Sequence, residues 1–129
     1  MRKAVGRILL VGPLQLLLFE SLMQLSVHSR ESTQELITLA HDMGMLMGCI
    51  WALLPGFAHI GPLLAKVLLR GVAALALFVA LYAGDYFYSW HLRPNLGLYR
   101  EPDWVAQHPG FQRDLRARIQ ANTWKADAR

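Results

Sequence analysis

This sequence has few charged residues. Asp, Glu, Lys and Arg make up 17% of its 129 residues, whereas they make up about a quarter of an average soluble domain. The shortage is uneven, because only six of the 22 charged residues (13 basic and 9 acidic) lie between Arg30 and Trp90. This distribution argues against an ordinary soluble globule, a disordered chain and a nucleic-acid-binding domain.

The sequence also has only one cysteine, Cys49. A single cysteine excludes an intramolecular disulfide framework and any zinc site built on paired cysteines. The motifs of P-loops, dinucleotide-binding folds and zinc peptidases are absent, as is a recognisable nucleophile with its base. We therefore expect that the chain is not an enzyme and binds no cofactor.

Long apolar stretches are abundant instead, since 54% of the residues are hydrophobic. A helix needs about 20 mostly apolar residues to cross a membrane, and three stretches reach this length, at about 8–29, 37–56 and 63–88. Pro55-Gly56 and Gly61-Pro62 mark a turn between the last two, which predicts an antiparallel hairpin. The sequence thus predicts an all-α integral membrane protein, with a transmembrane region over residues 1–90 and a soluble basic tail over residues 91–129.

The first apolar stretch also has features of a signal peptide, because Arg2, Lys3 and Arg7 precede it. Glu20 and the bulky His28 do not suit cleavage, so we expect a retained helix. More basic residues lie on the N-terminal side of a three-span arrangement than on the other, which favours a cytoplasmic N-terminus. The location that we expect is a bacterial inner (cytoplasmic) membrane.

Small residues recur at every fourth position in the second and third stretches. They are Ala40, Gly44, Gly48 and Ala52 in the second, and Ala76, Ala80 and Gly84 in the third. Helices in lipid associate through such residues, because they let the backbones approach closely. The depths of the two stripes match in a hairpin, so we expect them to face each other. The alternative is that Gly44 and Gly48 bind a partner or a second copy.

Polar side chains also interrupt the apolar stretches. They are Glu20, Gln24 and His28 at a spacing of four in the first, His41 and Asp42 in the second, and Asp85 in the third. Charges within a span are costly and often functional. The expected depths allow these side chains to form a polar pocket that opens toward the first loop. A proton relay and a purely structural pairing of helices are the two readings of this pocket.

Arg70 is the cation that we weigh as a partner for Glu20, although it starts roughly 10 Å away in depth. His41, Met45 and Cys49 form a second row at a spacing of four. Such soft side chains suit Cu(I), but Met and Cys more often fill space between helices. They are weak candidates only, and we predict no metal site.

The tail contains a predicted amphipathic helix after Pro109-Gly110, with Phe111, Leu115 and Ile119 on one face. Seven basic and four acidic residues give residues 91–129 a net positive charge. Basic amphipathic helices bind anionic headgroups, and the apolar face would alternatively pack on a partner.

The function that these features predict is association. We expect an accessory or assembly subunit of a larger membrane complex, whose partners are the lipid bilayer and other membrane subunits or further copies of itself, and not nucleic acid. The alternative is a self-assembling, holin-like pore-former or a small transporter linked to protons or metal ions.

Overall fold

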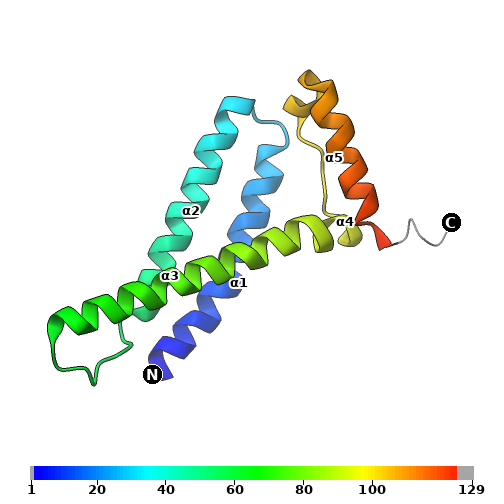
Figure 1. Cartoon of the computed structure of the whole chain (residues 1–129). Helices are drawn as coiled ribbons and strands as arrows, with labels where there is room; N and C mark the ends of the chain where they lie inside the picture. Colours follow the sequence, from blue (N-terminus) through cyan, green and yellow to red (C-terminus); the bar gives the residue numbers. More distant parts are fainter. Residues whose placement is uncertain (1, 125–129) are drawn as a thin grey trace.

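The computed structural model describes residues 2–124, and the regular elements over this range are helices (Figure 1). Three of them are long: α1 (Arg2–Ser26), α2 (Glu31–Leu53) and α3 (Leu63–Phe87). Each is long and apolar enough to cross a membrane. The structure therefore confirms the prediction of an all-α chain with three helices of membrane-spanning length.

The third helix continues beyond its predicted end. A π-helical turn, η1 (Tyr88–Leu92), and a short helix, α4 (Arg93–Leu96), extend it to Gly97, where φ is +74°. Pro94 stands in the first turn of α4, where its missing N–H is tolerated. The helix therefore continues past residue 91, where we placed the start of the tail, and ends at Gly97, with Arg93 and Asp85 on the same helical rod.

The tail then folds back toward the loop between α1 and α2. Its elements are a 3₁₀ helix, η2 (Asp103–Gln107), and α5 (Pro109–Ala121), which stands where we predicted a tail helix. The backbone N–H of Asp103 donates to the carbonyl of Val27 at 2.8 Å, and Val105 is fully buried. The last five residues of the predicted tail lie outside the described residues.

The glycines of α2 pack on α1, contrary to our expectation that they face α3. A Cβ atom added at Gly44 would meet Leu18 at 3.7 Å, and one added at Gly48 would meet Val11 at 3.4 Å. The reason is geometric: side chains four residues apart differ by about 40° in direction, so a stripe at this spacing turns around the helix and only part of it can face a given neighbour. The absence of side chains at these two positions lets α1 lie close to α2.

The contact between α2 and α3 includes Ala52 from the predicted α2 stripe, together with small residues outside the two stripes. Cys49 and Ala52 are fully buried, and Ala74 is nearly so. Leu77 and Leu81 pack over them. Figure 1 shows α3 running across the α1–α2 pair. The residues named above lie where α3 crosses α2.

Apart from Ala52, the small residues expected at this contact lie elsewhere. Ala76, Ala80 and Gly84 are exposed on α3, and Ala40 is exposed on α2. No heavy atom lies within 4 Å of a Cβ atom added at Gly84. The predicted pairing of the two stripes is therefore wrong, because α3 presents the side that carries Ala74 to α2.

Candidate functional site

Two groups of polar side chains lie between the helices. The first, which we call the Glu20 cluster, consists of Glu20, Gln24, Tyr88 and Arg93. Arg93 Nε donates to Glu20 Oε2 at 2.7 Å and Tyr88 Oη donates to the same oxygen at 2.9 Å, while Gln24 Nε2 donates to Glu20 Oε1 at 2.6 Å. Both carboxylate oxygens of Glu20 thus accept hydrogen bonds.

The charges of the Glu20 cluster also balance, because the Arg93 guanidinium pairs with the Glu20 carboxylate. The Arg93 side chain is only 1% exposed and that of Glu20 19% exposed, so the ion pair is largely removed from solvent. Arg93 Nη2 also lies 3.3 Å from the carbonyl oxygen of Leu98, to which it donates. Arg70, the partner that we weighed for Glu20, instead donates to the carbonyl of Gly56 in the α2–α3 turn at 2.9 Å.

The second group, which we call the His41 cluster, consists of Gln15, His41, Asp42 and Asp85. Gln15 Nε2 donates to Asp85 Oδ1 at 2.9 Å. His41 Nε2 lies 3.4 Å from Gln15 Oε1 and 3.5 Å from Asp85 Oδ2, and His41 Nδ1 lies 3.3 Å from Asp42 Oδ1. One imidazole therefore stands between two carboxyl groups, one on α2 and one on α3.

The His41 cluster is less well satisfied than the Glu20 cluster. The side chains of His41 and Asp85 are 8% and 7% exposed, yet Asp85 Oδ2 has no hydrogen-bond partner. Buried polar atoms are almost always hydrogen-bonded in folded proteins. An unpartnered carboxylate oxygen at this depth is therefore a notable exception.

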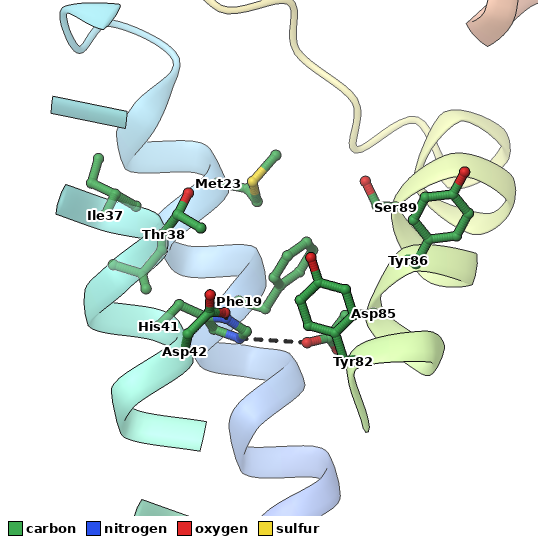
Figure 2. Close-up of a pocket in the computed structure, with 11 residues that line it drawn as sticks. Phe19, Met23, Ile37, Thr38, His41, Asp42, Tyr82, Asp85, Tyr86 and Ser89 are labelled. Carbon is green, nitrogen blue, oxygen red and sulfur yellow. Dashed lines mark hydrogen bonds and ion pairs between the residues drawn. The ribbon is translucent and has the colours of Figure 1, made fainter. Parts of the chain in front are cut away.

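A cleft of about 180 Å³ opens beside the His41 cluster. It is lined by Phe19, Leu22 and Met23 from α1, Ile37, Thr38, His41 and Asp42 from α2, Tyr82, Asp85 and Tyr86 from α3, and Ser89 from η1. Figure 2 shows that Asp85 reaches from α3 toward His41, with Asp42 beside it. The cleft thus lies between three helices, and its ionisable side chains lie close together.

The structure divides the polar pocket that we predicted. His41, Asp42 and Asp85 do line one cleft, whereas Glu20 and Gln24 form the separate Glu20 cluster. The six candidates therefore do not share a single site.

His28 belongs to neither group. Its side chain is 83% exposed, and its Nδ1 lies 2.8 Å from Asp103 Oδ2. A second pair of the same kind, His108 with Glu31 at 2.9 Å, links the tail to the start of α2. His28 therefore takes part in holding the tail against the first loop.

Three participants were missed at the sequence level: Gln15, Tyr88 and Arg93. Gln15 carries a signal, since it is an isolated amide in an otherwise apolar run. Tyr88 lies at the end of the third predicted span and Arg93 in the predicted tail, and neither was assigned to the polar pocket. The pairing of Arg93 with Glu20 links positions 73 residues apart, so no local pattern points to it.

The weak metal candidates are not assembled. Met45 and Cys49 are buried in an apolar contact with Ala74, while His41 turns toward Gln15 and the two carboxyl groups. Within residues 2–124, no group of three or more His, Cys, Asp and Glu side chains is placed to hold a metal ion. The two sulfur atoms therefore contribute to helix packing.

Outside the spans, an ion pair supports the fold of the tail. Arg116 donates to both carboxylate oxygens of Glu101, at 2.9 and 2.8 Å. These hydrogen bonds lower the pKa of Glu101 from its ordinary value. Burial raises the pKa of the neighbouring Tyr99 hydroxyl. The Glu101–Arg116 pair attaches α5 to the extended segment that precedes it.

Comparisons with family models, with curated proteins and with solved structures give no match for this chain.

Proposed function

We propose that this chain is a non-enzymatic accessory or assembly subunit of a larger membrane complex, and that it docks through the outer face of α3. The observation that carries the proposal is the outward position of Ala76, Ala80 and Gly84. We call these three residues the α3 stripe.

Small residues on the surface of a helix promote its association with other helices in lipid. Burial of leucine against leucine gains little there, whereas close approach of backbones through small residues favours helix association. Within this chain, α3 packs on α2 through another side that carries Ala74. The α3 stripe keeps the spacing of an association surface, and the part of the chain that the structure describes leaves it uncovered.

The test is to fill the α3 stripe without disturbing the chain. Ala80→Leu together with Gly84→Leu adds bulk where Gly84 has open space around it. We expect the complex extracted from native membranes in mild detergent to become smaller on a native gel, and the thermal stability of the purified chain to stay unchanged. Val79→Leu is the matched control, because Val79 is 58% exposed beside the stripe.

Two results would overturn the proposal. The wild-type chain could migrate as a monomer without partners, or the double variant could keep the full size of the complex. Co-purification of two differently tagged copies separates self-association from binding to other subunits. Dye leakage on expression, abolished by the double variant, would instead support the self-assembling pore-former.

A small transporter is the second candidate. The observation that favours it is the cleft that Asp85 and His41 border between the three helices. Ionisable groups inside the membrane often mark a path for ions or substrates. Transport into proteoliposomes that is lost with Asp85→Asn, and kept when the α3 stripe is filled, would select this function over the accessory role.

A further inference from the structure

The cleft beside the His41 cluster has room for a small ligand. Its volume is about 180 Å³, and a single water molecule needs roughly 10–15 Å³ on a comparable measure. Pockets for drug-sized ligands measure about 300–1,000 Å³. The cleft therefore suits a molecule of a few heavy atoms.

The ionisable side chains that line the cleft are mainly acidic. Among its eleven lining residues, α2 contributes His41 and Asp42, α3 contributes Asp85, and neither Lys nor Arg is present. With both carboxyl groups ionised, a protonated His41 leaves one net negative charge and a neutral His41 leaves two. Arg118 bonds the hydroxyl of Tyr86 from α5, but it does not line the cleft. A positively charged ligand is favoured.

An unused acceptor identifies the point of attachment. Asp85 Oδ2 has no hydrogen-bond partner, although the Asp85 side chain is only 7% exposed and His41 Nε2 lies 3.5 Å from this oxygen. Its other oxygen is held by Gln15 at 2.9 Å, so the carboxylate is fixed in orientation. A donor in the cleft would satisfy this oxygen, and a charge-assisted hydrogen bond is stronger than a neutral one.

The rest of the lining selects the kind of cation. Apolar and aromatic side chains predominate, including Phe19, Tyr82 and Tyr86. A metal ion would need several oxygen, nitrogen or sulfur ligands, whereas an organic ammonium ion gains from contact with aromatic faces. We infer that this cleft binds a small organic ammonium ion, with Asp85 as its counter-ion and Asp42 close by. The inference does not depend on the accessory role, which concerns the α3 stripe.

The test uses choline chloride and its uncharged isostere, 3,3-dimethylbutan-1-ol, on the purified full-length chain in detergent micelles. Isothermal titration calorimetry should show saturable binding of choline, with binding of the alcohol at least about tenfold weaker. Asp85→Asn should weaken choline binding by about tenfold or more. Asp114→Asn is the matched control, since it removes the same charge from a side chain that is 80% exposed on α5, and it should leave binding unchanged.

A second pair of variants tests the aromatic contact. Tyr82→Phe keeps the ring and should retain choline binding, whereas Tyr82→Leu should weaken it by about threefold. If Asp85→Asn does not fold, the two Tyr82 variants and Asp42→Asn test the inference instead, and Asp42→Asn should then weaken choline binding. The inference is overturned if choline shows no saturable binding, if the alcohol binds equally well, or if Asp85→Asn or both Tyr82 variants bind choline like the wild type. Filling the α3 stripe should not alter choline binding, so the two proposals fail separately.

Discussion

The Glu20 cluster and the His41 cluster are both polar groups within an apolar helical framework, but they differ in how completely their atoms are paired. Glu20 meets a cation and two further donors, and both of its oxygens are used. Asp85 meets an amide and a histidine at 3.5 Å, and one of its oxygens remains without a hydrogen bond. Only the second cluster borders the cleft described above.

This difference separates two uses of buried polarity. A carboxylate that is fully paired by its own chain stabilises one arrangement of the helices and has little left to offer a ligand. A carboxylate that is held in place but only partly satisfied can bind something else. The first kind therefore fits a structural role, and the second kind fits a site.

The largest effect should come from removing the cation of the Glu20 cluster. Arg93→Met leaves Glu20 without its charged partner in a largely buried position. Loss of one partner of a buried pair costs about 3–5 kcal/mol, so we expect the free energy of unfolding in detergent to fall by that order.

Arg100→Met is the control for this prediction, because Arg100 is exposed and donates only to nearby backbone carbonyls. The double change Glu20→Gln with Arg93→Met should recover much of the loss, since no buried charge remains. If Arg93→Met and Arg100→Met have equal effects on unfolding, the structural role of the Glu20 cluster is wrong.

A smaller difference in the free energy of unfolding is expected between variants of the two carboxylates, Glu20 and Asp85. Glu20→Gln removes the charge that Arg93 faces and should lower the free energy of unfolding by about 2–4 kcal/mol. Asp85→Asn should change it by less than about 1 kcal/mol, because the new amide oxygen can still accept from Gln15 and an incompletely paired charge disappears. Chemical unfolding of both variants, followed by helical circular dichroism, measures the difference. Equal losses in the two variants would remove the distinction between the clusters.

The smallest effect is expected for the Glu101–Arg116 ion pair, which lies outside the spans. It is the exposed counterpart of the buried Glu20–Arg93 pair. Arg116 lowers the pKa of Glu101 from its ordinary value of 4.5. The pair therefore stabilises the tail above pH 4.5, and this contribution is lost as the pH falls through the lowered pKa. Water screens the interaction, because the Arg116 side chain is 64% exposed.

Arg116→Ala should raise the pKa of Glu101 toward 4.5, as measured by NMR titration of its carboxyl carbon. Arg113→Ala is the control, since Arg113 lies near Asp114 instead. An unchanged titration in Arg116→Ala would show that the pair does not form in solution.

The sequence was sufficient to predict the three spans, but not to predict which faces of the helices pack against one another. Length and hydropathy are local properties, so three apolar runs predict three helices directly. The spacing of small residues shows which positions share a face, but the rotation of each helix about its axis depends on its neighbours. For this reason Gly48 faces α1 while Gly84 faces outward, although both belong to stripes of the same spacing.

The polar sites were predictable only in part. His41, Asp42 and Asp85 line one cleft, and the depths expected for an antiparallel hairpin allowed them to come together. Arg93 was assigned to the tail that we predicted from residue 91, whereas the helix continues to Leu96. Gln15 was missed because a single amide in an apolar run does not indicate which distant side chains it contacts, here Asp85 and His41.

The pairing of Glu20 with Arg93 also bears on how the chain is made. The two residues are 73 positions apart, and ribosomes add about 5–20 residues per second. Glu20 is thus synthesised roughly 4–15 s before its counter-ion, Arg93. During that interval α1 has an acidic group and no cation to neutralise it, so stable insertion of the first helix is expected to await translation of the third.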